Sequence, residues 1–268
     1  MSVRRFWRTT ISTTHLEPYG EYHELMSSPH ASIGWDENRP GPKTRGIAVR
    51  MDWRELLFVH WRVDPDQLAE VLPDGLEVDT FDGSAWIGLV PFLMDDVRFF
   101  GLPGLPTLRR FHECNVRTYV LRNGVPGVWF FSLDAASRLA VLGGRRLWKL
   151  NYIHSRFDVR KDGATVDYRL RRPDGTGCHV QWTPTDPLPR SEPGSLRNFL
   201  TERYYLYAGG SHRLLRGPVW HEPWSLRRAD VHVLDDQLVG RTGIETIGDP
   251  VCIAAEPLKV RGWVNRKT

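Results

Sequence analysis

Cysteine is scarce in this chain, and its distribution argues against two kinds of scaffold. Cys114, Cys178 and Cys252 are odd in number, lie far apart and form no C-x-x-C pair. This pattern is typical of a reducing compartment, and it argues against a disulfide framework and a cysteine-rich zinc site. The histidines show no metal-ligand spacing either, so we expect no metal and no cofactor.

Long apolar runs and basic blocks are also missing. No stretch approaches the length of a membrane span, so we expect no membrane association. Arg4 and Arg5 are followed by polar residues from Thr9 to His15, which does not fit a twin-arginine export signal, and we expect a cytoplasmic protein. The net charge of +4 is spread among 32 acidic residues, so nucleic acid is not an expected partner.

Several catalytic signatures are absent as well. The sequence has no glycine-rich phosphate loop, no G-x-S-x-G elbow, no H-E-x-x-H motif and no dinucleotide fingerprint. Kinases, hydrolases of the elbow type, zinc proteases and Rossmann oxidoreductases are therefore not expected.

The chain divides into a tail and one domain. Residues 1–45 are rich in Ser, Thr, His, Pro and Gly without helical or strand periodicity, and they predict a flexible N-terminal tail. Residues 46–268 carry regular patterns and enough apolar residues for one core, since the chain is 41% hydrophobic. We expect a single domain in this second part.

Short strands dominate the expected domain. Alternating apolar residues predict strands over residues 55–63, 76–81, 84–94, 111–121, 128–134 and 152–159, and further strands follow residue 220. Helices are expected after Asp64, over residues 135–148 and after Ser195, where Asp and Ser are good N-caps. This order predicts a mainly β fold, a barrel or sandwich core with a few helices packed outside.

Six sequence blocks carry a family resemblance. They follow one another in the same order over about four fifths of the chain, and they occupy residues 51–54, 72–79, 115–120, 127–134, 199–204 and 221–226. With them the chain resembles the YqjF-like family of uncharacterised conserved bacterial proteins. That family looks like a branch of the acetoacetate decarboxylase superfamily, which implies a β-barrel-like core around a small-molecule cavity.

The resemblance also implies where a pocket would lie. Arg54 stands in the place of the decarboxylases' pocket arginine and Glu113 in that of a pocket glutamate. Their second pocket glutamate corresponds to Trp86, and their Schiff-base lysine to Tyr152. Because a phenol cannot form the protonated imine of those enzymes, we expect no decarboxylase activity of that kind. Lys149 lies nearby, but we expect it to be an exposed lysine at a helix end.

Arg54 and Glu113 form the central pair of the expected site. Each charge would be costly inside a barrel unless partnered, and the two could neutralise one another. With a ligand present, Arg54 could offer its guanidinium fork to a carboxylate or a polarised carbonyl. The alternative is a structural ion pair that holds two strands in register.

Further ligand-binding candidates follow from the strand pattern. Period-two alternation places Asn115 and Arg117 on the side of Glu113, while Cys114, Val116 and Thr118 face the other way. Tyr152 and His154 share one face of the next strand, which makes them a candidate acid and base; the alternative, solvent exposure, is favoured for His154.

The last candidates lie in the final block. His221 could donate a hydrogen bond at a pocket mouth that Trp224 walls, although Trp224 as a core residue beside His221 fits equally well.

Three functions remain open from the sequence. The first is a pocket protein that binds an organic acid or carbonyl compound through Arg54 and an aromatic wall including Trp86 and Tyr152. The second is a lyase, isomerase or dehydratase that uses Tyr152 as acid and Glu113 as base, with Arg54 stabilising developing negative charge. The third is a scaffold for protein partners, marked by an exposed aromatic patch. The sequence is compatible with an oligomer.

Overall fold

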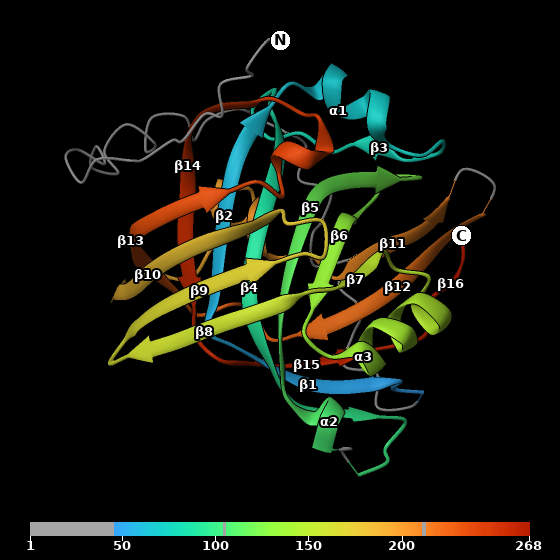
Figure 1. Cartoon of the computed structure of the whole chain (residues 1–268). Coiled ribbons are helices and arrows are strands. Elements are labelled where there is room, and N and C mark those ends of the chain that lie inside the picture. Colours follow the sequence, from blue (N-terminus) through green and yellow to red (C-terminus); the bar gives the residue numbers. More distant parts are fainter. Residues whose placement is uncertain (1–45, 104–105, 211–212) are drawn as a thin grey trace, which may run out of the picture.

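The computed structural model describes residues 46–103, 106–210 and 213–268, and the expected tail over residues 1–45 lies outside them. The described chain consists mainly of strands that form one connected sheet. Helices are few and short, so the expected mainly β fold with helices outside the sheet is confirmed (Figure 1).

Seven strands of this sheet close on themselves. Each pairs with the next in the order β4-β5-β6-β11-β12-β15-β1, and β1 pairs with β4 again to complete the ring. Most of these pairs are antiparallel, whereas β6 and β11 run parallel. The strands are β4 (Ala85–Phe99), β5 (Phe111–Arg122), β6 (Val125–Ala135), β11 (Tyr205–Gly210), β12 (Arg213–His221), β15 (Leu258–Gly262) and β1 (Val49–Arg54).

A second set of strands extends the sheet from β4. It runs in the order β2-β14-β13-β10-β9-β8 and points to the left in Figure 1, away from α3. These strands are β2 (Leu56–Val63), β14 (Thr246–Ala255), β13 (Leu226–Asp236), β10 (Gly177–Pro187), β9 (Thr165–Arg171) and β8 (Arg156–Asp162). Three short strands pair with the ring: β3 (Glu77–Val78) with β5, β7 (Tyr152–His154) with β6, and β16 (Arg266–Lys267) with β12.

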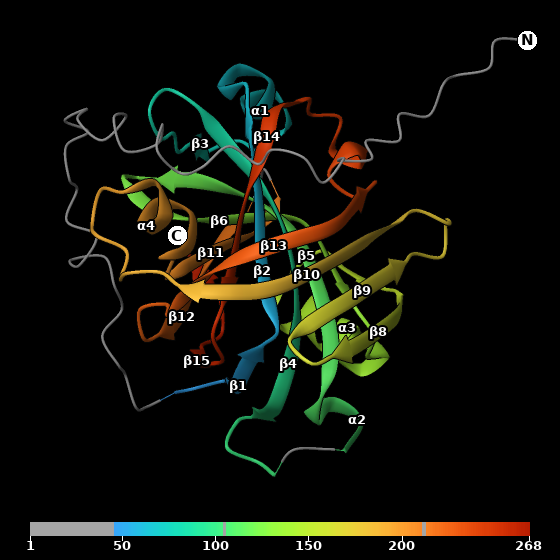
Figure 2. The same cartoon turned by 90° about the vertical axis from the view of Figure 1, so that its left-hand side faces the viewer.

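The helices begin where capping residues predict. Asp64 accepts hydrogen bonds from two backbone N–H groups of α1 (Pro65–Val71), and Ser195 caps α4 (Leu196–Thr201), which lies on the left in Figure 2. The remaining helical segments are α2 (Pro106–Arg109), α3 (Arg138–Gly143), a π-helical turn η2 (Gly144–Trp148) and a 3₁₀ turn η3 (Gly240–Thr242). None of the helices in the described ranges is long and apolar enough to cross a membrane.

Two apolar cores lie on opposite faces of the shared strands. On β2, Phe58 packs with the residues inside the ring, whereas Leu57 and Val59 pack between the ring and the extension. This division follows from the period-two alternation of side chains along a strand. It gives the ring an interior of its own, in which a site can form.

The segment after α3 differs from its prediction. The expected helix over residues 135–148 begins only at Arg138 and ends in η2, and the expected strand over residues 152–159 is broken at Ser155. Ser155 donates a hydrogen bond of 2.6 Å to the buried Asp134, and the chain leaves β7 to pair with β9 as β8. A buried hydrogen bond therefore decides a strand boundary that alternation alone could not reveal.

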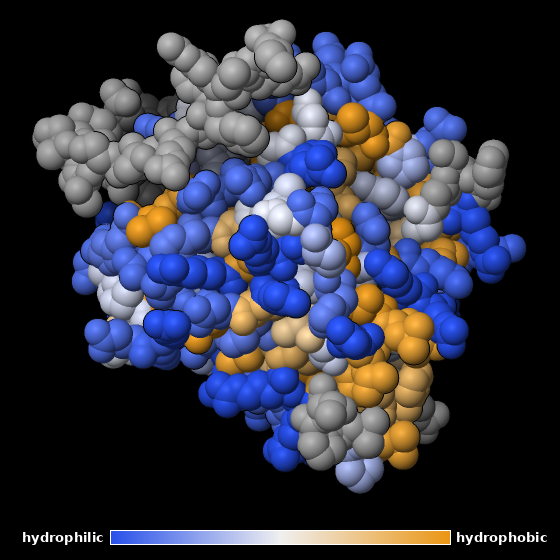
Figure 3. Space-filling model, in the orientation of Figure 1, coloured by the Kyte–Doolittle hydropathy of each residue, from blue (hydrophilic) through white to orange (hydrophobic). Residues whose placement is uncertain are grey.

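Apolar side chains also reach the surface beside α3. Figure 3 shows a hydrophobic area at the lower right, where Figure 1 places α3 and α2. Exposed apolar residues of α3, η2 and the segment after β4 are Leu139, Leu142, Leu147, Phe100 and Leu102. Phe100 is the only aromatic residue among the large exposed hydrophobics of the described chain.

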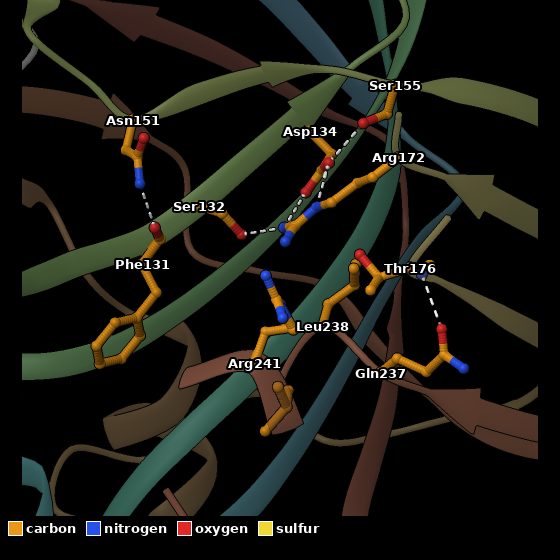
Figure 4. Close-up of polar contacts among 12 residues, drawn as sticks. Phe131, Ser132, Asp134, Asn151, Ser155, Arg172, Thr176, Gln237, Leu238 and Arg241 are labelled. Carbon is orange, nitrogen blue, oxygen red and sulfur yellow. Dashed lines mark hydrogen bonds and ion pairs between the residues drawn. The ribbon is translucent and has the colours of Figure 1, made fainter. Parts of the chain in front are cut away.

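A buried ion pair links the ring to the extension. Arg172, beside β9, reaches Asp134 of β6 with two nitrogens, at 2.8 Å and 2.6 Å, and donates a further hydrogen bond to Ser132 (Figure 4). Asp134 has no exposed surface, and only 8% of the Arg172 side chain is exposed. Because the charges compensate each other fully, we assign this network a structural role.

Candidate functional site

A cavity of about 140 Å³ lies inside the ring of strands. Its wall is mostly apolar and aromatic, and a few polar side chains interrupt it, an arrangement typical of small-molecule sites. The polar side chains of the lining belong to Glu113, Asn115, Arg117, Tyr152, Thr201, Arg203, Tyr205 and His221.

Strand β5 supplies the inner row. Glu113, Asn115 and Arg117 line the cavity, whereas Cys114 and Val116 pack in the core on the opposite face. The predicted alternation of this strand is confirmed. The side-chain oxygen Oδ1 of Asn115 is buried and has no hydrogen-bond partner within the described chain. An unsatisfied amide between two ionisable side chains is available to a ligand.

Glu113 and Tyr152 form a buried pair in the wall. The Tyr152 hydroxyl donates a hydrogen bond of 2.9 Å to Glu113 Oε2, and Glu113 is 2% exposed. Burial raises the pKa of Glu113 to about 8, and the hydrogen bond from Tyr152 opposes this rise only in part. Glu113 is therefore mainly a neutral acid at pH 7. It can donate its proton to a ligand oxygen through Oε1.

Arg117 is the buried cation of the cavity. Its Nη2 donates hydrogen bonds to the Leu200 carbonyl at 3.0 Å and to the Tyr119 hydroxyl at 3.3 Å, and its Cζ lies 5.1 Å from the centroid of the Phe58 ring. Nε is buried without a partner, and no carboxylate pairs with this guanidinium anywhere in the described chain. A 9% exposed arginine without a counter-ion favours an anionic ligand.

A second buried layer holds Arg117 in place. The Tyr119 hydroxyl donates a 2.6 Å hydrogen bond to the Leu200 carbonyl and lies 2.6 Å from His60 Nε2. Because the Tyr119 hydroxyl donates its one proton to the Leu200 carbonyl, the contact with His60 must be a hydrogen bond from His60 Nε2–H to the Tyr119 oxygen. Burial, and then the positive charge of Arg117, lower the pKa of His60 well below its usual value, so His60 is neutral. The layer adds no negative charge near Arg117.

Aromatic rings continue from Arg117 along one wall. The Phe58 ring contacts the edge of Trp224 with centroids 5.2 Å apart, and Trp224 stacks on Trp53 at 5.8 Å. Trp53 in turn meets Phe92 at 5.6 Å, and His221 packs against both tryptophans. All of these residues line the cavity. Trp224 thus forms an apolar part of the wall, and His221 packs beside it.

Arg54 does not lie where the resemblance implies. It pairs with Asp95 at 3.2 Å, 46% of its side chain is exposed, and it is not part of the cavity wall. The expected pair with Glu113 is not formed, since Glu113 contacts Tyr152 instead. The physical reason is alternation on β1: Val49, Met51 and Trp53 point inward, so Arg54 points outward.

Trp86 and His154 also lie outside the cavity wall. Trp86 is on the inward face of β4 but nearer α4, where it packs with Tyr119 and Phe199 in a separate cluster. His154 ends β7 and is half-buried, so its face of the strand does not continue the wall that Tyr152 begins. Of the nine residues predicted for the site, the structure brings together Glu113, Asn115, Arg117, Tyr152, His221 and Trp224.

Lysines and metal ligands do not contribute to the site within the described residues. None of the side chains that line the cavity is a lysine, and Lys149 is exposed at the end of η2, as expected. No group of three or more His, Cys, Asp or Glu side chains in residues 46–103, 106–210 and 213–268 is placed to hold a metal ion. The tryptophans of these ranges are buried or half-buried, so they form no exposed aromatic patch.

Sequence reasoning missed part of the wall. Trp53 lies beside Arg54 in the first of the six family blocks, and Phe58 lies on a strand that is buried on both faces. The signal for Trp53 was present, since the alternation of β1 that turns Arg54 outward turns Trp53 inward. Arg203 is buried and pairs with Asp79, a contact between distant segments that no local pattern reveals.

The fold and this cavity define a β-rich protein whose strand ring encloses a few polar groups. The chain belongs to the family DUF2071, described as an uncharacterized conserved protein, whose model matches residues 50–259. It is 37% identical over 222 residues to the uncharacterized protein YqjF of Bacillus subtilis (strain 168), which covers 82% of this chain and 92% of YqjF. The predicted family is confirmed.

Solved structures show the fold at low sequence identity. The enduracididine biosynthesis enzyme MppR in complex with pyruvate matches with a TM-score of 0.59 and 14% identity, over 82% of this chain and 90% of MppR. Acetoacetate decarboxylase from Legionella pneumophila matches with a TM-score of 0.58 and 14% identity, over 85% of this chain and 92% of that protein. The acetoacetate decarboxylase-like fold is thereby confirmed.

Proposed function

We propose that this protein binds a small organic acid in the cavity, with Arg117 holding the carboxylate. The observation that carries this proposal is a buried guanidinium without a carboxylate partner in the described chain. The nearby acid Glu113 is neutral at pH 7, and the pair of Arg203 and Asp79 compensates itself. Arg117 is therefore the cation of the lining that a bound monoanion would balance.

The relatives support the same class of ligand. MppR is described in complex with pyruvate, a small keto acid, and acetoacetate decarboxylase is named for another. Both are similar to this chain in fold. Because the cavity also offers the neutral acid Glu113 and the amide of Asn115, the ligand's carbonyl or hydroxyl oxygen has partners beside the carboxylate.

Decarboxylation through an imine is not part of this proposal. Tyr152 stands where the resemblance places the reactive lysine, and a phenol forms no imine with a keto acid. The lysine-free wall of the cavity, in the part of the chain that the structure describes, supports a role without this chemistry. Because the lining holds no lysine among the described residues, the first experiment measures ligand binding and not decarboxylation.

Isothermal titration calorimetry with pyruvate, acetoacetate and phenylacetate tests the proposal. We expect binding of at least one acid, and a loss of affinity of about thirtyfold or more in Arg117→Gln, since removing one partner of a buried charge pair costs about 2 kcal/mol or more. The matched control is Arg54→Gln, because Arg54 lies outside the wall and should leave the affinity unchanged.

The ligand itself provides a test that needs no variant. The methyl ester of the tightest acid keeps the shape and loses the charge, so wild-type protein should bind it at least tenfold more weakly. Equal affinity for the acid and its ester would contradict the proposal, as would equal losses in Arg117→Gln and Arg54→Gln.

A second candidate is an enzyme that moves a proton on the bound acid. The observation that favours it is the hydrogen bond between Tyr152 and Glu113, whose pKa of about 8 lies close to neutral pH. Such a pKa suits a group that both accepts and releases a proton. Glu113 in its ionised form, whose share grows as the pH approaches 8, would act as the base, Tyr152 as the acid, and Arg117 would stabilise the negative charge of an enolate.

Deuterium exchange separates the enzyme from the binder. Proton NMR of pyruvate or acetoacetate in D₂O should show faster loss of the protons beside the carbonyl when the enzyme is present. Tyr152→Phe should abolish this acceleration and leave binding within a few-fold of wild type. Exchange at the rate of the protein-free solution would rule out this second candidate and leave the binding protein.

A further inference from the structure

The charge of the cavity lies at one end of a row of aromatic rings. Arg117 Cζ stands over Phe58, and the ring contacts continue through Trp224 and Trp53 to Phe92. Phe92 is the partner of Glu113 across the strands β4 and β5. The row therefore leads from the buried cation to the pair of Glu113 and Tyr152.

The spacing between the two ends is set by strand geometry. Phe58 is level with Asn115, because Val59 pairs with Leu89 and Val90 pairs with Asn115. The Arg117 guanidinium over Phe58 thus stands one inward position from Glu113, about 7 Å along the strand. One six-membered ring with substituents at opposite positions spans a gap of this size. The cavity volume of about 140 Å³ is also close to that of cavities that hold a benzene ring.

The far end accepts a neutral group and disfavours a charge. Tyr152 already donates to Glu113 Oε2, and the protonated Glu113 keeps its other oxygen free for a hydroxyl or carbonyl. Arg203, the other arginine of the lining, is engaged with Asp79 and Phe199. A second carboxylate at this end would therefore meet no free cation and would lose its hydration without compensation.

We propose that the ligand is an aromatic monocarboxylate with a neutral hydroxyl or carbonyl group opposite the acid, of the 4-hydroxyphenyl carboxylate class. The proposal rests on the proposed function, since it places the carboxylate on Arg117. The ring lies against Trp53 and Trp224, where offset stacking adds to simple burial. The neutral group lies at Glu113.

Calorimetry with four probes tests this ligand class on the wild-type protein. We expect 4-hydroxyphenylacetate to bind about tenfold more tightly than phenylacetate, which is one buried hydrogen bond of about 1.4 kcal/mol. Acetate, which lacks the ring, should bind more weakly than phenylacetate. So should 4-carboxyphenylacetate, which carries a second charge.

A double variant tests where the hydroxyl lies. Glu113→Met combined with Tyr152→Phe removes both partners of one hydrogen bond and keeps their shapes, a change that folded proteins tolerate. In this variant phenylacetate should still bind, and 4-hydroxyphenylacetate should lose its tenfold advantage. Tyr168→Phe is the matched control, because Tyr168 bonds to the backbone carbonyl of Glu113 and is not part of the cavity wall.

The outcomes separate the two proposals. If acetate or pyruvate binds as tightly as 4-hydroxyphenylacetate, the aromatic ligand class is wrong and the proposed acid binding stands. If the advantage of the hydroxyl survives in the double variant, its placement at Glu113 is wrong. If no carboxylate binds, or if binding ignores Arg117→Gln, the proposed function itself fails.

Discussion

The Tyr152 hydroxyl donates a 2.9 Å hydrogen bond to Glu113, and this bond joins two elements that are 39 residues apart in sequence. Tyr152 begins β7, which pairs with β6, and Glu113 lies on β5 on the other side of β6. The bond keeps an ionisable side chain in an apolar wall by satisfying one of its oxygens. Its effects can be measured on the free energy of unfolding and on the titration of Glu113.

Tyr152→Phe should affect both properties. We expect a loss of about 1 kcal/mol in the free energy of unfolding, the usual value for one buried hydrogen bond. Because the Tyr152 hydrogen bond lowers the pKa of Glu113, its removal should raise that pKa further. Urea unfolding and carbon NMR of the labelled carboxyl measure the two effects. Tyr168→Phe should lose similar stability, and an equal shift of the Glu113 titration there would contradict the account.

Glu113 should make the protein less stable as the pH rises. Its pKa is about 8 when folded and near 4.5 as a free side chain, so between these values the folded state holds a proton that the unfolded state has released. Its contribution is fully present below pH 4.5 and is lost as the pH rises through 8, at a slope of about 1.4 kcal/mol per pH unit. The difference between wild type and Glu113→Gln in urea unfolding from pH 5 to 9 isolates this slope, and parallel curves would refute it.

Two neighbouring glycines should respond oppositely to alanine. A Cβ on Gly144 would lie 2.3 Å from the ring of Tyr152, whereas one on Gly143 meets nothing within 4 Å. We expect Gly144→Ala to lose about 1–3 kcal/mol and to disturb the cavity, since overpacking displaces Tyr152. Gly143→Ala should gain up to about 1 kcal/mol, because alanine favours the helix. Thermal unfolding of both variants measures these changes in stability. Equal effects of the two substitutions would contradict the close packing of Gly144 against Tyr152.

Arg172 should matter more for stability than another arginine of the same hairpin. Arg172→Met leaves the fully buried Asp134 without its counter-ion, and we expect a loss of about 3–5 kcal/mol. Arg169→Met removes a pair with Asp167 in which 56% of the arginine side chain is exposed, and the loss should be much smaller. Urea unfolding at pH 7 compares them, and similar losses would show that burial does not separate the two pairs.

The sequence predicted the fold where alternation and capping decide it. The inward row of β5 and the caps at Asp64 and Ser195 follow from local rules, and the structure confirms them. The family blocks supplied the rest of the architecture. The break at Ser155 was missed because it depends on Asp134, 21 residues away, which only the folded chain brings near.

The site was predicted less evenly. Tyr152 and Glu113 are neighbours in the wall, as the resemblance implied, but Arg54 is not, because alternation on β1 turns it outward. Alternation of side chains along β1, used in place of the position that the family resemblance gave to Arg54, would have selected Trp53 as the residue of β1 that lines the cavity. The missing carboxylate partner of Arg117 could not be read from the sequence, since it depends on every side chain that surrounds the guanidinium in the described fold.

A crystal structure of the complex with phenylacetate tests the central claim most directly. The account predicts the carboxylate within hydrogen-bond distance of Arg117 Nη1 and the ring against Trp53 and Trp224 inside the strand ring. A carboxylate bound to Arg54, or density only on the outer surface, would contradict the assignment of Arg117 as the anion-binding residue.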